Sequence, residues 1–90
     1  MKPETGIKRF LVMLMRRPQL DLAVIPLHQQ FLESLREEGR NEMSGGFADK
    51  SGGAYLLRAQ SLEEALTIAH SDPAHTSGGW DVTVYEWNTH

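Results

Sequence analysis

The chain has 90 residues and a formal net charge of −3, and its basic residues are scattered, which argues against nucleic acid as the main partner. It contains no cysteine, which excludes a disulfide framework and thiolate chemistry. Because it shows neither a secretory signal nor an apolar run long enough to cross a membrane, we expect a single cytoplasmic domain over residues 1–90.

The N-terminal part predicts an arm followed by a strand. Residues 1–7 are polar, and we expect them to form a flexible arm. Residues 8–17 are apolar at every position from Phe10 to Met15, a run too short for a helix of ordinary length. They predict a strand that is covered on both faces.

A helix is predicted from about Asp21 to Glu38. Pro26 fits if it lies in the first turn, where the missing N–H group costs little, and Gly39 closes the helix as a C-terminal cap. One side of this helix carries its apolar stripe, which consists of Val24, His28, Phe31, Leu32 and Leu35.

The glycine-rich run SGGFADKSGG, residues 44–53, is flanked by two segments that suit a β-hairpin, 40–47 and 52–58. The run is not a Walker phosphate loop, because Asp49 and Ser44 occupy positions that need glycine and because a strand follows instead of a helix. We expect Gly52 and Gly53 to serve the turn, and Asp49 to bond its local backbone.

The C-terminal part predicts a helix and a strand. Ser61 and Glu64 form a capping box, and the helix that they begin runs to about Ser71 before Pro73 stops it. Residues 80–87 are rich in aromatic and β-branched types and predict the last strand. The order β-α-β-β-α-β predicts an α+β, ferredoxin-like fold, in which a four-stranded antiparallel sheet carries two helices on one face.

The predicted first strand is apolar on both faces, whereas two helices cover only one face of the sheet. An uncovered second face would be an apolar patch of a kind that monomers seldom expose. We therefore expect a homodimer, in which two copies pack through their sheet faces around a barrel-like core. The alternative is that Met13 and Met15 are exposed apolar residues that a monomer tolerates.

Two ionisable groups stand in unexpected positions. His28 lies in the apolar stripe of the first helix, and Asp72 follows the second helix, where the helix dipole disfavours negative charge. Both helices pack on one face, so the two side chains can meet, and a carboxylate that orients an imidazole is an ordinary general-base arrangement. Two alternatives stay open: a core histidine bonded to a carbonyl or water, and an Asp-Pro turn.

Other polar residues carry weaker signals. His70 and His75 match no strong metal-ligand spacing, so we predict no metal, and no cofactor motif is present. Ser44 does not lie in a G-x-S-x-G nucleophile elbow and is a candidate for a pocket wall. Arg16 and Arg17, at the end of the first strand, either meet an anionic substrate or form a solvated strand end.

Several short motifs follow one another in a characteristic order: Leu27-His28, Phe31-Leu32, Leu35, Gly39, Ser44-Gly45-Gly46, Ser61-Leu62-Glu63-Glu64-Ala65 and Asp72-Pro73. In this order and spacing the chain resembles the YCII-related (YciI-like) proteins of the dimeric α+β barrel superfamily. The resemblance extends from about Arg9 to Trp87.

The resemblance implies that His28 and Asp72 form an active-site pair, with Ser44 as a neighbour. Gly45, within the Ser44-Gly45-Gly46 motif, and His75, shortly after Asp72-Pro73, are further candidates for substrate contacts. The family often has an aromatic residue after Asp-Pro, where this chain has alanine and histidine. A few relatives in the family are dehydrochlorinases that act on small cyclic or chlorinated aromatic compounds.

Together these features predict a cofactor-free enzyme that performs elimination, isomerisation or dehydrochlorination on a small organic molecule. The histidine would act as general acid or base, the aspartate would orient it, and the serine would donate a hydrogen bond to the substrate. The alternative is a non-catalytic module that binds a small ligand or another protein. A third interpretation makes both ionisable groups purely structural.

Overall fold

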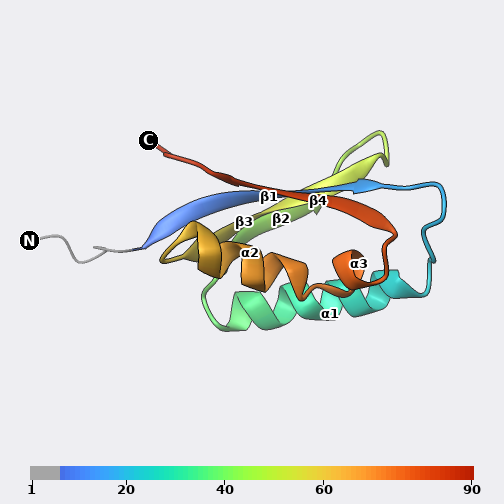
Figure 1. Ribbon diagram of the computed structural model, residues 1–90, viewed down its shortest axis with the longest axis horizontal. Coiled ribbons are helices and arrows are strands. Elements are labelled where there is room, and N and C mark those ends of the chain that lie inside the picture. The colour runs from blue at the N-terminus through green and yellow to red at the C-terminus, as the bar shows by residue number, and fades with distance from the viewer. Residues whose placement is uncertain (1–6) are drawn as a thin grey trace, which may run out of the picture.

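The computed structural model describes residues 7–90, which form a four-stranded antiparallel sheet with helices on one face (Figure 1). The sheet order is β2-β3-β1-β4, and the predicted ferredoxin-like fold is confirmed. The predicted arm lies outside the described residues except for Ile7. The elements are β1 (Lys8–Arg16), α1 (Val24–Glu37), β2 (Asn41–Gly46), β3 (Gly52–Ala59), α2 (Leu62–His70), α3 (Pro73–Thr76) and β4 (Trp80–Glu86).

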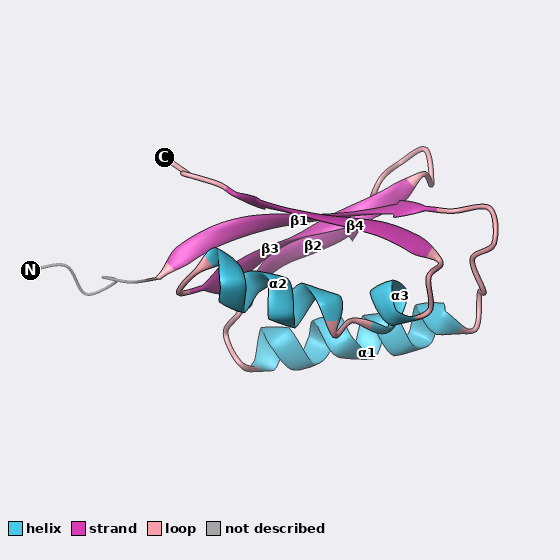
Figure 2. Ribbon diagram, viewed as in Figure 1, coloured by secondary structure: helices cyan, strands magenta, loops and turns pink. Residues whose placement is uncertain are grey.

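The core lies between the sheet and the helix layer (Figure 2). Side chains alternate across β1, so Phe10, Val12 and Leu14 face the helices and are buried. The other buried apolar residues are Leu35, Tyr55, Leu57, Ala59, Ala65, Ala69, Ala74 and Trp80. Among residues 7–90, none of the helices has the length and apolarity needed to cross a membrane.

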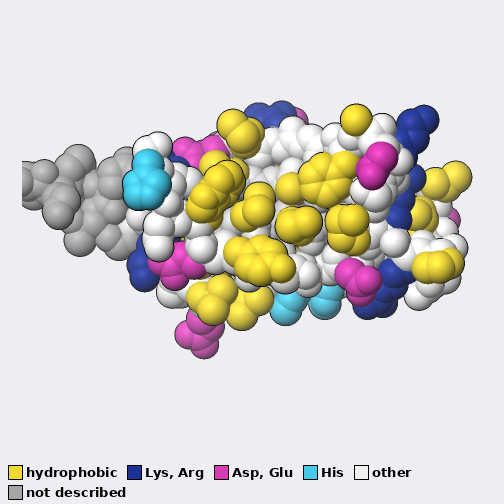
Figure 3. Space-filling model, turned by 90° about the horizontal axis from the view of Figure 1, so that it is seen from above, with side chains coloured by type: hydrophobic (Ala, Val, Ile, Leu, Met, Phe, Trp, Pro, Cys, Tyr) yellow, Lys and Arg dark blue, Asp and Glu magenta, His cyan; other side chains and the backbone are white. Residues whose placement is uncertain are grey.

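The opposite face of the sheet is covered only in part within one chain. Figure 3 looks onto this face, where hydrophobic side chains gather over the strands. The strand registers place Leu11, Met13, Met15, Met43, Leu56 and Tyr85 there, and each of them is partly or largely exposed. The sequence predicts that the first strand is covered on both faces. Within residues 7–90 of the single chain, only the face of β1 that points toward the helices is covered.

The hairpin between β2 and β3 forms as predicted, but two of its glycines have another role. Asp49 accepts a hydrogen bond from the backbone N–H of Ser51 at 2.9 Å, and the positive φ in the loop belongs to Lys50, at 65°. Gly52 and Gly53 begin β3 instead of forming the turn. An added Cβ would lie 2.0 Å from the Leu14 carbonyl oxygen at Gly52, and 2.6 Å from that of Gly45 at Gly53. They are glycines because neighbouring strands approach closely.

The first helix has the predicted boundaries within a few residues. It begins later than predicted, so that Pro26 lies in its first turn. Gly39 has a φ of +78° and closes the helix as predicted. The N–H groups of Gly39 and Arg40 donate to the carbonyls of Arg36 and Leu35 at 2.9 and 2.8 Å, which is a Schellman motif.

The second helix begins with the predicted serine cap. The Ser61 hydroxyl accepts a hydrogen bond from the Glu64 N–H at 3.1 Å. The Glu64 carboxylate accepts from the N–H of Gln60 at 2.8 Å, one residue before the position that a capping box predicts. The prediction of two helices misses α3, a helix of 4 residues that Pro73 begins.

Candidate functional site

The structure brings His28 and Asp72 into contact. The His28 Nδ1 atom lies 2.7 Å from one oxygen of the Asp72 carboxylate and 2.9 Å from the other. An ionised carboxylate only accepts, so in a neutral ring this contact places the proton on Nδ1 and leaves the lone pair on Nε2. The side chain of Asp72 is 0% exposed and that of His28 is 19% exposed. The pair therefore joins a buried carboxylate to a ring that reaches solvent.

Asp72 holds this position because it also caps α3. Its backbone is extended, and its Oδ1 atom accepts a hydrogen bond from the Ala74 N–H at 2.8 Å. Pro73 follows at the first helical position, which is the ordinary place for proline. The two interpretations of the Asp-Pro element are thus compatible, because one carboxylate caps α3 and bonds the ring of His28.

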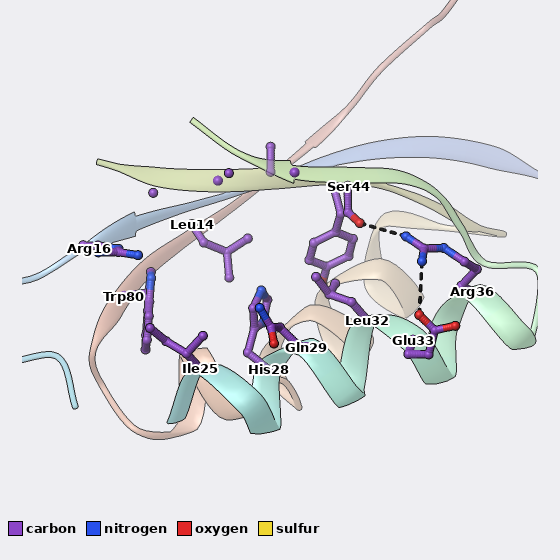
Figure 4. A pocket seen from close by; sticks show the side chains of 16 residues that line it. Leu14, Arg16, Ile25, His28, Gln29, Leu32, Glu33, Arg36, Ser44 and Trp80 are labelled. Carbon is purple, nitrogen blue, oxygen red and sulfur yellow. Dashed lines mark hydrogen bonds and ion pairs between the residues drawn. The ribbon is translucent and has the colours of Figure 1, made fainter. Parts of the chain in front are cut away.

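A cavity of about 390 Å³ lies between α1 and the hairpin end of the sheet (Figure 4). His28 lines it near the middle, and Asp72 is not among its lining residues. The Nδ1 edge of the ring faces the carboxylate, so the Nε2 edge is the one available to the cavity. The apolar side chains of the lining are Leu14, Ile25, Leu32 and Trp80, and backbone comes from Gly45, Gly46, Gly52, Gly53 and Ala54, whose own side chain lies on the outer face of the sheet.

Ser44 and Gly45, two of the predicted substrate contacts, both line this cavity. The Ser44 hydroxyl oxygen accepts from the guanidinium of Arg36 at 3.1 Å and from the amide of Asn41 at 3.4 Å. Arg36 is itself bonded to Glu33 at 3.1 Å (Figure 4). With its oxygen fixed by two donors, Ser44 can direct its own O–H toward a bound molecule.

His75, the third predicted substrate contact, does not line the cavity. Its ring stacks on the ring of His70, with centroids 4.3 Å apart, and its Nδ1 atom lies 3.1 Å from the His70 carbonyl oxygen. The short α3 helix keeps the two histidines together on the surface. Within residues 7–90, no group of three or more His, Cys, Asp or Glu side chains is placed to hold a metal ion.

Tyr55 is a cavity residue that is absent from the predicted site. Its side chain is 1% exposed, and its hydroxyl has no hydrogen-bond partner among the described residues. Burial, and next the nearby charge of Asp72, raise the pKa of Tyr55 well above its ordinary value. The hairpin register places it directly opposite Ser44. That register was the available signal, since cross-strand partners share a face.

Comparison with known sequences identifies related chains. The profile of the family described as the YCII-related domain matches residues 9–88. The uncharacterised protein YjpA of Bacillus subtilis strain 168 is 41% identical over 78 residues, which cover 87% of this chain and 92% of that protein.

Two solved structures share the fold. One is the 5-chloro-2-hydroxyhydroquinone dehydrochlorinase TftG of Burkholderia phenoliruptrix AC1100, in complex with 2,5-dihydroxybenzoquinone. Its TM-score is 0.74 at 22% identity, over 91% of this chain and 95% of that one. The other is Rv0793 of Mycobacterium tuberculosis, with a TM-score of 0.55 at 19% identity, over 93% and 97% of the two chains. At these identities the likeness shows the fold alone.

Proposed function

Because this chain belongs to the YCII-related family, we propose that it is a cofactor-free enzyme that moves a proton on a small organic molecule through His28 and Asp72. One observation carries the proposal. A buried carboxylate holds the Nδ1 atom of a histidine that lines a cavity of about 390 Å³. A general base needs this arrangement, because it fixes the tautomer and leaves one basic nitrogen for the substrate.

The arrangement supports a simple sequence of proton transfers. His28 Nε2 takes a proton from a C–H or O–H group of the bound molecule, and the carboxylate of Asp72 stabilises the imidazolium that forms. The electron pair released by the substrate then forms a double bond. In an elimination, a leaving group such as chloride departs with its own electron pair, and in an isomerisation the proton returns to another atom.

Two polar groups suit the charge that develops on the substrate. The Ser44 hydroxyl is free to donate to a substrate oxygen, and Arg36, bonded to the same serine, keeps it in place. The fold is also that of a dehydrochlorinase whose reaction is an elimination. That chemistry makes elimination of chloride from a hydroxylated ring the first reaction to test.

We also propose that two copies of the chain form a homodimer through the outer faces of their sheets. Among residues 7–90, no helix or further sheet packs over the apolar side chains on that face of β1 and β3 (Figure 3). A symmetric partner that packs on them would remove this area from water. The cavity lies on the opposite side of the sheet, next to α1, so it stays open in such a dimer.

The test is release of chloride from 5-chloro-2-hydroxyhydroquinone, followed with the parent protein and with His28→Gln and Asp72→Asn. We expect His28→Gln to lower kcat/KM at least about 100-fold, since general-base catalysis contributes roughly 10²- to 10⁴-fold. His70→Gln removes an exposed histidine that does not line the cavity and is the matched control, with activity close to that of the parent.

Turnover that survives His28→Gln unchanged would contradict the catalytic role of the pair. Binding of the ring compound in the cavity without any turnover by the parent would favour the alternative, a non-catalytic module that binds a small ligand. Nuclear magnetic resonance (NMR) shift mapping with the same compound separates these two outcomes.

A further inference from the structure

Arg16 occupies a position in β1 that the core pattern reserves for apolar residues. The inward-facing positions of this strand are Phe10, Val12, Leu14 and then Arg16, because side chains alternate along a strand. Arg16 pairs directly with Trp80 of β4, so the two side chains lie on the same face. A cation therefore follows the apolar stripe at the end of β1, where the strand forms part of the cavity wall.

The close-up of the cavity shows where the charged groups lie. Arg16 stands at one end, beside Trp80, and Arg36 stands at the other end, with His28 between them (Figure 4). Any molecule that reaches from His28 toward Trp80 therefore comes close to the guanidinium of Arg16. The lining at that end is otherwise apolar, with Leu14 and Ile25 as neighbours.

Within the described part of the chain, Arg16 differs from the other two arginines of this region because its side chain has no partner. Arg17 binds Asp81 through its Nε atom at 2.8 Å and also donates to the Gly78 carbonyl. Arg36 is bonded to a glutamate and a serine. The side chain of Arg16 makes no hydrogen bond and no ion pair with any residue from 7 to 90. No carboxylate of residues 7–90 therefore pairs with its positive charge.

The charge balance of the lining has the sign opposite to that of the protein. Two arginines, Arg16 and Arg36, face the cavity against one glutamate, Glu33, and this glutamate is already paired. The chain as a whole carries a formal net charge of −3. Because Arg36 is paired with this glutamate, Arg16 is the charged group of the lining that attracts small anions, at its own end of the cavity.

We infer that the molecule bound in this cavity is a small organic anion, and that Arg16 binds its negative group. The negative group is a carboxylate, which a guanidinium binds through two parallel hydrogen bonds, or an ionised acidic hydroxyl, which accepts charge-assisted hydrogen bonds at its single oxygen. The rest of the molecule lies over the bare glycine backbone and against Trp80, with the atom that loses its proton near His28 Nε2. The inference rests on the proposed function and adds to it the charge of the substrate.

Arg16 then acts as a specificity-determining residue and not as a base. It holds one end of the substrate, while the histidine acts at the middle of the cavity. The competing interpretation is a solvated strand end, in which the guanidinium only meets water. If that interpretation is correct, an anionic molecule and a neutral molecule of the same shape bind equally well.

The experiment uses benzoate and benzamide, which have nearly the same shape and differ in charge. Trp87→Phe serves as the background, because the chain has 2 tryptophans and the remaining emission then comes from Trp80 in the cavity wall. We expect benzoate to bind at least about tenfold more tightly than benzamide. Arg16→Gln should weaken benzoate about tenfold and leave benzamide unchanged, and added salt should weaken benzoate alone.

Arg17→Gln is the matched control, because it removes the same charge from the next residue, whose guanidinium is bound to Asp81. It should leave the affinity for benzoate within about twofold of the parent. Arg16→Lys should recover part of the affinity, since it restores the charge without the paired hydrogen bonds.

Two results overturn the inference, and they differ in what they say about the proposed function. If benzamide binds as tightly as benzoate, or if Arg16→Gln has no effect on benzoate, the cavity binds ligands but does not select anions. If neither probe changes the Trp80 emission or shifts NMR signals of cavity residues, the cavity does not bind these molecules. That result contradicts both the inference and the ligand binding that the proposed function requires. Both results are measurements of binding, so neither depends on the turnover measured with His28→Gln.

Discussion

A carboxylate without solvent contact needs partners, and Asp72 has them on two sides. The ring N–H of His28 and the backbone N–H of Ala74 both donate to it, at distances of 2.7 to 2.9 Å. An unpaired buried charge would cost far more free energy than such a group can recover by packing. The same hydrogen bonds that make the burial of Asp72 tolerable also fix the orientation of His28.

Tyr55 should make stability depend on alkaline pH. Burial and the charge of Asp72 raise its pKa in the folded protein, whereas an unfolded tyrosine titrates near 10. Above about pH 10 the unfolded state loses this proton and the folded state keeps it. The stabilisation is therefore present below that pH and is lost as the pH rises, by up to about 1.4 kcal/mol per pH unit.

Tyr55→Phe should remove this component and show a shallower loss of stability between about pH 10 and 11. At pH 7 the variant should be at least as stable as the parent, because it removes a buried hydroxyl that has no partner among the described residues. Thermal unfolding followed by circular dichroism across this range measures both effects. Parallel pH profiles of parent and variant would refute the prediction.

The cavity is formed where α1 faces the glycine-rich ends of β2 and β3. Gly46 pairs with Gly53, and alternation places both on the same face as Ser44. The sheet therefore presents backbone without side chains across from His28. This gap between the helix and the sheet gives a ligand room beside the histidine.

Gly46→Leu should fill this space. A Cβ at Gly46 meets only the Gly52 carbonyl oxygen, at 3.7 Å, which is an ordinary contact, so we expect the unfolding free energy to change by less than about 1 kcal/mol. Benzoate should bind at least about tenfold more weakly, measured by the emission of Trp80. Gly46→Ala, with a much smaller side chain, should stay close to the parent. Undiminished binding by Gly46→Leu would show that the ligand lies elsewhere.

The elements show what the sequence predicts and where prediction stops. The four strands and the two longer helices follow from periodicity, caps and glycines, because each pattern extends over at least one full element. The helix α3 has 4 residues, which is too short to display a helical period. The sequence predicts a turn role for Gly52 and Gly53, because the close approach of neighbouring strands leaves no signal within one segment.

The residues of the candidate site can likewise be predicted only where their signal lies within one element. His28 and Asp72 stand out from the sequence because each conflicts with its local environment, and this conflict is visible within a single element. Tyr55 conforms to ordinary strand composition, and the sequence leaves Arg16 open between contact with an anionic substrate and a solvated strand end. Their importance depends on the pairing of strands, which brings Tyr55 opposite Ser44 and Arg16 opposite Trp80.

For the whole molecule, the proposed homodimer predicts a mass twice that of one chain. Met13 lies in the middle of the outer face of β1, between Ala54 and Thr83 of the neighbouring strands. Met13→Glu should therefore give a monomer, since a charge buried in an apolar interface has no partner. Gln30→Glu adds the same charge on the exposed side of α1 and should remain a dimer.

Size-exclusion chromatography with light scattering measures these masses. A parent protein that is monomeric at about 100 µM would contradict the dimer and favour the alternative of tolerated exposed methionines. We also propose that residues 1–90 form a single domain. A single domain of this size unfolds cooperatively, so we expect one unfolding transition for the parent and the variants.

The central claim is that Asp72 holds the proton of His28 on Nδ1 and leaves Nε2 bare toward the cavity. A long-range ¹H–¹⁵N correlation spectrum measures this directly, with the ring signals of His28 assigned by their loss in His28→Gln. For the neutral ring we predict a protonated Nδ1 and an unprotonated Nε2, and a mixture of both tautomers in Asp72→Asn. A neutral His28 that carries its proton on Nε2 in the parent protein would contradict the claim.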